Sequence, residues 1–136
     1  MVKVGIISIG DELLHGFTVN TNSSYIAKEI SSYTDLDVNS IISIKDDIGH
    51  IESSLTHHIE NNFNLLFITG GLGPTHDDIT KRALCRFFDS SLILHKSHFV
   101  KLKKKLKKYK VKNHSHIESQ SMIFDISKPI DNNYGM

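Results

Sequence analysis

A glycine-rich segment carries the clearest chemistry in this chain. Residues 69–80 read Thr-Gly-Gly-Leu-Gly-Pro-Thr-His-Asp-Asp-Ile-Thr and join an apolar run to an amphipathic one. Glycines let the backbone approach a ligand closely, and the start of the following helix presents unpaired N–H groups and a partial positive charge. We therefore expect an anion site here. The expected ligand contacts are Gly70, Gly71, Gly73, Pro74, Thr75 and His76.

Two aspartates at the end of this segment change the expected chemistry. Asp77 and Asp78 would repel a phosphate unless a cation lay between them. Mg²⁺ commonly takes one or two carboxylates together with substrate phosphates and water. The pair therefore favours metal-assisted phosphate chemistry, with Mg²⁺ or another divalent metal bound by Asp77 and Asp78. The alternative is a helix cap and a favourable first-turn acid, and for Asp77 this alternative has at least equal weight.

A second polar cluster follows the first apolar run. Residues 10–16 read Gly-Asp-Glu-Leu-Leu-His-Gly, and Asn-Thr-Asn follows at residues 20–22. Glu12 is expected to complete the metal or ligand site. Asn20 and Asn22 are candidate ligand contacts, although Asn22 also fits the N-cap of the next helix.

A third acidic pair follows the next apolar run. Asp47 directly precedes a helical pattern and fits an N-cap, whereas Asp46 is a candidate site residue. Acids at three strand ends, namely Glu12, Asp46 and Asp78, exceed what capping requires. We expect these three to belong to one metal or ligand site.

The elements that must position these residues alternate along the chain. Apolar runs predict strands at 2–9, 38–44 and 65–69, and amphipathic periods predict helices at 22–32, 48–61, 78–88 and 97–110. Such alternation indicates an α/β fold with a mostly parallel sheet between helical layers. Ligands bind at the carboxyl ends of strands in such sheets, and each motif above follows a predicted strand. Residues 117–124 indicate a short turn or helix, and 129–136 a loop.

The composition fits one small domain. The 136 residues are 39% hydrophobic, enough for an ordinary core. We expect residues 1–136 to form a single domain that lacks its closing elements at the carboxyl end. The single cysteine excludes an internal disulfide and favours a reducing compartment. The start of the chain does not read as a signal peptide and no apolar run is long enough to span a membrane, so we expect a cytoplasmic protein without a membrane partner.

Basic residues concentrate in one segment. Residues 101–112 hold eight of the sixteen Lys and Arg residues and no acid. A surface helix with a solvated basic face is favoured over a nucleic-acid or membrane-binding helix. Among the histidines, no zinc-binding spacing appears, and the pair His57-His58 is expected on the surface of its helix.

The two long motifs, residues 10–22 and 69–80, resemble those of the MoaB/Mog molybdopterin-binding superfamily. The similarity is closest to the amino-terminal domain of competence/damage-inducible CinA proteins, and it extends to the molybdopterin-binding-like domain of eukaryotic FAD synthases. It covers residues 1 to about 125 and implies a three-layer α/β/α sandwich. By motif match, Asp78 corresponds to an aspartate that adenylylating members need for catalysis, and Asp46 to an acid that they also use. Glu12 lies in the family's Gly-x-Glu-Leu-Leu motif, and the resemblance thus implies Asp78, Asp46 and Glu12 as the catalytic carboxylates.

The resemblance implies several functions. The first is metal-assisted hydrolysis of a nucleotide diphosphate such as ADP-ribose or FAD. The second is a module that binds molybdopterin or a nucleotide, or that transfers an adenylyl group to molybdopterin. A nucleic-acid binder acting through residues 101–112 is a third, less favoured alternative. The expected partners are a phosphorylated nucleotide or pterin ligand and further copies of the chain in a dimer or trimer.

Overall fold

The computed structural model describes residues 1–72, 79–108, 117–130 and 132. These residues form two compact units. The first unit contains the described residues 1–72 and 79–84, and the second contains 85–108, 117–130 and 132. The expectation of a single domain over the whole chain stays a prediction. No helix among the described residues is long and apolar enough to cross a membrane.

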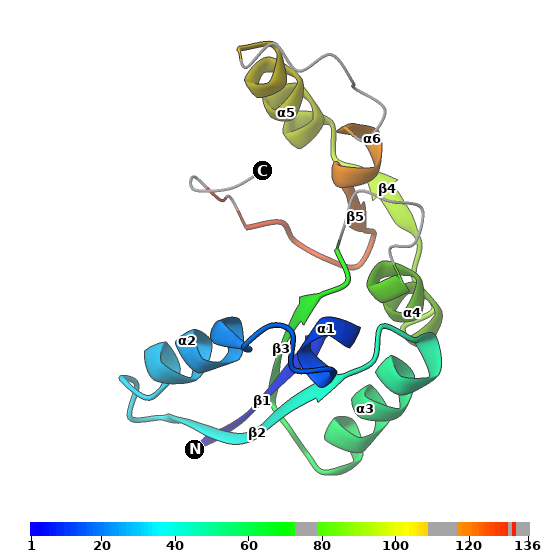
Figure 1. Ribbon diagram of the computed structural model, residues 1–136. Helices are drawn as coiled ribbons and strands as arrows, with labels where there is room; N and C mark the ends of the chain where they lie inside the picture. The colour runs from blue at the N-terminus through cyan, green and yellow to red at the C-terminus, as the bar shows by residue number, and fades with distance from the viewer. Residues whose placement is uncertain (73–78, 109–116, 131, 133–136) are drawn as a thin grey trace. The chain divides into compact units, whose positions relative to one another are not determined.

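A parallel three-stranded sheet forms the centre of the first unit (Figure 1). Its strands are β1 (Val2–Ile9), β2 (Leu36–Ile44) and β3 (Leu65–Gly70), in the order β2-β1-β3. The central strand β1 is buried from Val4 to Ile9. A continuous apolar run is what a strand covered on both faces requires. The three predicted strands are confirmed, with β2 beginning two residues earlier and β3 ending one residue later.

Helices cover both faces of this sheet (Figure 1). They are α2 (Thr21–Ile30), α3 (Ile48–Glu60) and the first part of α4 (Ile79–Phe87), and a short helix α1 (Asp11–Leu14) follows β1. Ser8 of β1 bonds to the cap of α2, whereas Gly5 packs against a side chain of α3. Residues of odd and even number on a strand point to opposite faces, so α2 and α3 lie on opposite sides. This confirms the predicted α/β fold.

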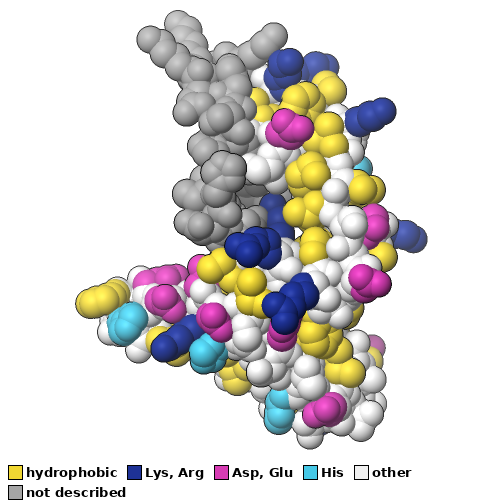
Figure 2. Space-filling model, turned by 90° about the vertical axis from the view of Figure 1, so that its right-hand side faces the viewer, with side chains coloured by type: hydrophobic (Ala, Val, Ile, Leu, Met, Phe, Trp, Pro, Cys, Tyr) yellow, Lys and Arg dark blue, Asp and Glu magenta, His cyan; other side chains and the backbone are white. Residues whose placement is uncertain are grey.

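The second unit has its own small sheet and two helices. Strands β4 (Leu92–Leu94) and β5 (Met122–Phe124) pair antiparallel, and helices α5 (Lys96–Lys108) and α6 (Ile117–Gln120) lie between them in the chain. Leu102 of α5 and Ile117 of α6 are buried, while Lys101 and residues 103–105 are exposed. The amphipathic helix predicted at 97–110 is thus confirmed as far as residue 108. On the face shown in Figure 2, basic side chains stand among hydrophobic and acidic ones.

Two predictions about helix α2 and helix α3 were wrong. The N-cap of α2 is Asn20 and not Asn22, because the chain turns into the helix two residues earlier than the apolar period suggests. His58 of α3 is fully buried rather than on the surface. The ring of His58 can be buried against the sheet because both of its nitrogen atoms find hydrogen-bond partners there.

The partners of His58 come from α3 and from the sheet. The ring Nδ1 donates to the carbonyl oxygen of Ser54 at 2.7 Å, since a carbonyl can only accept, and Nε2 lies 3.1 Å from the Ser40 hydroxyl. The ring packs edge-on against Phe63, with centroids 4.6 Å apart. Gly5 leaves room for it, because a Cβ there would lie 2.7 Å from the ring carbon Cδ2.

Candidate functional site

A row of hydroxyl side chains crosses the sheet near the carboxyl ends of its strands. Ser8 of β1 pairs in register with Ser43 of β2 and with Thr69 of β3. Residues in register share a face of a sheet, so the three hydroxyls lie on the face covered by α2. Each stands next to the last residue of its strand. The sheet therefore ends in a polar row on this face.

Asn20 ties this row to the start of α2. Its Oδ1 accepts hydrogen bonds from the Ser23 N–H at 3.1 Å and from the Ser8 hydroxyl at 3.3 Å, and its Nδ2 donates to the Ser43 hydroxyl at 3.1 Å. The Thr69 hydroxyl in turn donates to the Ser8 hydroxyl at 3.4 Å. One amide side chain thus fixes the relative positions of two strands and the N-terminus of a helix.

A hollow of about 400 Å³, part of it open to solvent, lies beside this network. It is lined by residues from β1, α1, the 18–20 segment, the start of α2 and the end of β3. Four predicted site residues line it together, namely Glu12, Asn20, Asn22 and Gly70. Its walls combine apolar side chains with hydroxyl, amide and carboxylate groups. Such an amphipathic hollow suits a small organic ligand with a polar edge.

The glycine segment leaves β3 in a conformation that only glycine permits. Gly70 and Gly71 have φ angles of 91° and 60°. A Cβ on Gly70 would overlap the Ile9 carbonyl oxygen, and one on Gly71 would overlap the Thr80 hydroxyl. Thr80 is buried on α4, and its hydroxyl donates to the Gly70 carbonyl oxygen at 3.1 Å. The start of the segment is therefore held tightly against β1 and α4.

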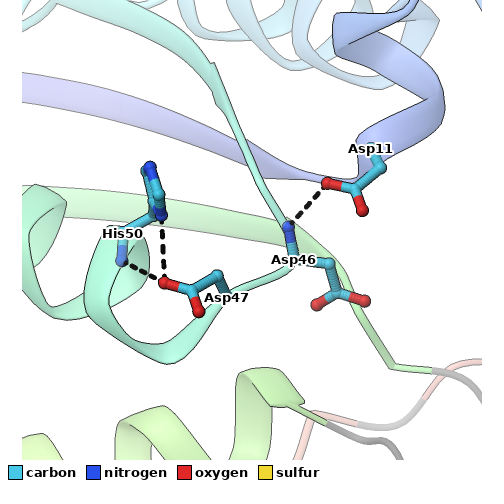
Figure 3. A network of polar contacts seen from close by, with 4 residues as sticks. All are labelled: Asp11, Asp46, Asp47 and His50. Atoms are coloured by element: carbon cyan, nitrogen blue, oxygen red, sulfur yellow. Dashed lines mark hydrogen bonds and ion pairs between the residues drawn. The ribbon is translucent and has the colours of Figure 1, made fainter.

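Asp46 lies against this glycine segment. A Cβ added to Gly71 would stand 3.0 Å from the Asp46 Oδ1 atom. The backbone N–H of Asp46 donates to the Asp11 carboxylate at 3.3 Å, as Figure 3 shows. Asp11, which alone reads as an ordinary turn residue, thus holds the end of β2 next to α1. The structure brings Asp46 to the glycine segment, and Glu12 to the hollow beside it.

Asp47 has a different role from its neighbour. Its Oδ1 accepts from the His50 backbone N–H at 3.1 Å and lies 3.0 Å from the His50 Nδ1. In Figure 3 its side chain points toward His50, whereas the Asp46 side chain points away. The hydrogen bonds from the side chain and the backbone of His50 lower the pKa of Asp47 below its ordinary value of 3.8. The predicted N-cap is confirmed.

The remaining predicted site residues lie outside the described part of the chain. They are Gly73, Pro74, Thr75, His76, Asp77 and Asp78. Among the described residues, no group of three or more His, Cys, Asp or Glu side chains could hold a metal ion. Mg²⁺ needs only one or two protein carboxylates when phosphates and water supply the rest. The Asp46 carboxylate beside Gly71 fits one such ligand, and the metal prediction remains open.

The sequence motifs alone do not reveal the hydroxyl row or the burial of Thr80. A signal for the row existed, because Ser8, Ser43 and Thr69 each interrupt an apolar strand one residue before its end. Thr80 stands in the glycine-rich motif itself, at the start of α4. Polar residues at equivalent places in neighbouring parallel strands are therefore worth testing as members of one edge.

The chain is similar to known families and proteins over most of its length. A family model described as "Probable molybdopterin binding domain" matches residues 5–129. A CinA-like protein of Fusobacterium nucleatum is 40% identical over 112 residues, which cover 82% of this chain and 27% of that protein. A CinA-like protein of Thermotoga neapolitana is 35% identical over 137 residues, covering 99% of this chain and 33% of that protein. The chain thus spans about a quarter to a third of the length of these curated relatives.

Solved structures show the same fold. The crystal structure of CinA from Thermoplasma acidophilum, a protein of unknown function, superposes with a TM-score of 0.79 and 26% identity, covering 98% of this chain and 77% of that one. The molybdopterin biosynthesis enzyme MoaB from Thermus thermophilus superposes with a TM-score of 0.61 and 21% identity, covering 75% and 64%. At 21% identity, the match with MoaB shows a similar fold and nothing more.

Proposed function

This chain belongs to the molybdopterin-binding domain family, and from that premise we propose that it binds a diphosphate-containing nucleotide or pterin and hydrolyses the diphosphate with a divalent metal. The family match and the CinA-like relatives confirm the resemblance found in the sequence. The chain spans only part of those relatives, so the proposal concerns this domain and rests on its own residues.

The observation that carries the proposal is the place of Asp46. Its carboxylate lies against the backbone of Gly71 at the carboxyl edge of a parallel sheet. That edge is where ligands bind in such sheets, and a carboxylate beside an expected phosphate site calls for a cation. The Asn20 network and the hollow stand at the same edge. They would seat the organic part of the ligand while the glycine segment faces its phosphates.

In the proposed reaction water adds across the diphosphate. The water oxygen forms a bond to one phosphorus, the bond from that phosphorus to the bridging oxygen breaks, and the bridging oxygen leaves with the second phosphate. Asp46 and Asp78 would hold the metal, which when bound offsets the charge of the phosphates and polarises the attacked phosphorus. Glu12, exposed at the hollow, would accept the proton that the water loses. From ADP-ribose the products are AMP and ribose 5-phosphate.

The test is hydrolysis of ADP-ribose and FAD by the 136-residue chain. Each substrate is incubated with Mg²⁺, Mn²⁺ or Co²⁺, or with a chelator, and AMP is measured by chromatography. We expect metal-dependent AMP release that Asp46→Asn and Asp78→Asn each reduce about 100-fold or more. Asp37→Asn is the matched control, because Asp37 is an exposed carboxylate near the opposite end of the same strand. It should leave the rate unchanged.

A ligand-holding role is the second candidate, and the description of the matching family favours it. The domain would then bind molybdopterin or a nucleotide, or transfer an adenylyl group to molybdopterin, without hydrolysing a diphosphate. Folded protein that releases no AMP with any metal would overturn the hydrolase proposal for these substrates. Binding of the same ligands measured by calorimetry in that case would support the second candidate.

A further inference from the structure

Helix α5 carries a concentration of positive charge that the proposed reaction does not use. Residues 96–108 hold seven lysines and no aspartate or glutamate. Residues 1–72, in contrast, hold three lysines and nine acidic residues. The formal net charge of +1 for the whole chain hides this segregation. A polyanion would therefore be repelled by residues 1–72 and attracted to α5.

The apolar side of α5 is used inside its own unit. Leu102 is only 3% exposed. Phe99 is half-buried, and the Nζ atom of Lys103 lies 5.8 Å from the centre of its ring. Among the described side chains of α5, Val100 is the one large apolar group that is exposed. A helix that binds a membrane surface buries a whole apolar face among the lipids, and the described part of α5 has no such face left to offer.

The lysines surround the exposed side of α5. Five of them have described side chains, and all five are exposed. With 3.6 residues per turn, two fall on one flank, two on the other and one between them, in the order Lys96 and Lys103, Lys101 and Lys105, and Lys104. Like charges three or four residues apart destabilise a helix. These five side chains form a lysine surface whose mutual repulsion an anionic partner would relieve.

We propose that this lysine surface binds the phosphate backbone of double-stranded DNA. The major groove of B-form DNA is about 12 Å wide and admits an α-helix, whose diameter with side chains is about 10–12 Å. Lysines on the two flanks of α5 then face the phosphates of the two strands. A duplex supplies phosphates in two continuous rows, which matches charge on two flanks better than the single row of an acidic peptide does.

The type of basic residue indicates how selective this binding is. Helix α5 contains no arginine, and a lysine ammonium acts as a point charge, whereas an arginine guanidinium forms a rigid fork that bonds in pairs. Phosphate contacts position a protein on DNA without reading its bases. Binding through α5 is therefore independent of base sequence. It uses no residue of the proposed hydrolytic site, so the two proposals are tested separately.

Fluorescence anisotropy of a short labelled DNA duplex, titrated with the 136-residue chain at several salt concentrations, tests the proposal. The logarithm of the affinity should fall linearly with the logarithm of the salt concentration, because each contact between a lysine and a phosphate releases counterions. The combined change Lys101→Gln, Lys104→Gln and Lys105→Gln should make this slope shallower by about 2 to 3. It should also weaken binding about tenfold or more at low salt.

A matched control removes the same charge elsewhere in the chain. Lys28, Lys45 and Lys128 are exposed and lie outside α5, so changing these three to glutamine should leave the slope and the affinity as in the wild type. Glutamine has nearly the helix propensity of lysine, and circular dichroism verifies that the α5 variant keeps its helix content. Replacing the same three α5 lysines with arginine keeps the charge and should preserve the affinity.

Four results would overturn the inference. Wild-type protein without salt-dependent binding of the duplex would refute it, and equal weakening in the two glutamine variants would show that net charge attracts the DNA and α5 does not. Stronger binding to vesicles that contain phosphatidylserine would assign the surface to a membrane. Equal affinity for duplex RNA, whose narrow major groove side chains cannot read, would refute the placement of α5 in the groove. AMP release is unaffected by any of these results, so the proposed function is judged separately.

Discussion

The first unit places a polar side chain from a helix against each face of its sheet. His58 of α3 reaches the Gly5 and Ser40 row on one face, and Asn20, the cap of α2, reaches the Ser8 and Ser43 row on the other. The rows lie three residues apart along β1 and β2. His58 is fully buried, whereas Asn20 borders a hollow that is open to solvent.

The difference shows how position along a strand decides what a polar group does. A polar ring that packs against the middle of a covered strand meets no water, so the protein must supply its hydrogen-bond partners. His58 accordingly has a carbonyl, a hydroxyl and an aromatic ring around it. At the carboxyl end the same kind of network borders open space. We infer that the first network serves stability and the second serves both stability and binding.

The largest expected effect is on stability, when the buried contact of His58 with the Gly5 and Ser40 row is removed. His58→Ala removes a buried ring and leaves the Ser40 hydroxyl without this partner, so we expect the free energy of unfolding to fall by about 3 kcal/mol. His57→Ala is the matched control, because the neighbouring His57 is exposed on the same helix. It should change stability by less than about 0.5 kcal/mol. Chemical denaturation followed by circular dichroism measures the stability of both variants. Equal losses for His58→Ala and His57→Ala would contradict a stabilising role for the buried His58 ring.

A smaller effect, on both stability and ligand affinity, is expected at the Ser8 and Ser43 row that Asn20 contacts. Asn20→Ala removes the N-cap of α2 and the link to Ser43, so stability should fall by about 1 kcal/mol and affinity for ADP-ribose should fall with it. Asn22→Ala separates the two contributions, since Asn22 is exposed, lines the same hollow and is not the cap. It should weaken binding and leave stability unchanged. If Asn20→Ala kept the wild-type affinity for ADP-ribose, the contacts of Asn20 with Ser8 and Ser43 would serve stability alone, as those of His58 do.

Sequence patterns predicted the fold well because long periodic signals dominate it. Strands β1, β2 and β3 and helices α2, α3 and α5 follow from apolar runs and periods of three and four residues. The short elements were missed for the same reason: α1 and β4 contain four and three residues, too few to show a period. The burial of His58 could not be read from its helix, because the room for its ring comes from Gly5, far away in the chain.

The sequence predicts a candidate site at the carboxyl edge of the sheet, and the structure brings several of its predicted members together there. Parallel strands bring their carboxyl ends together, which is why Glu12, Asn20 and Gly70 line one hollow. Sequence spacing already distinguishes Asp46 from Asp47, because only Asp47 directly precedes the helical pattern that begins at Ile48. The structure adds the contacts that separate their roles: Asp47 accepts from His50, and Asp46 lies against Gly71.

The smallest effect tests that distinction. The pKa of Asp47 is lowered by the hydrogen bonds from His50, so its folded value lies below the unfolded one. The stabilisation is therefore fully present above the ordinary value of 3.8 and is lost as the pH falls through the folded pKa. Asp47→Asn keeps a capping oxygen without the charge, so its melting temperature should be slightly below that of wild type at neutral pH, and the gap should close in acid. If Asp47→Asn instead abolished metal-dependent hydrolysis, Asp47 would belong with Asp46 at the edge, and a cap alone would not describe it.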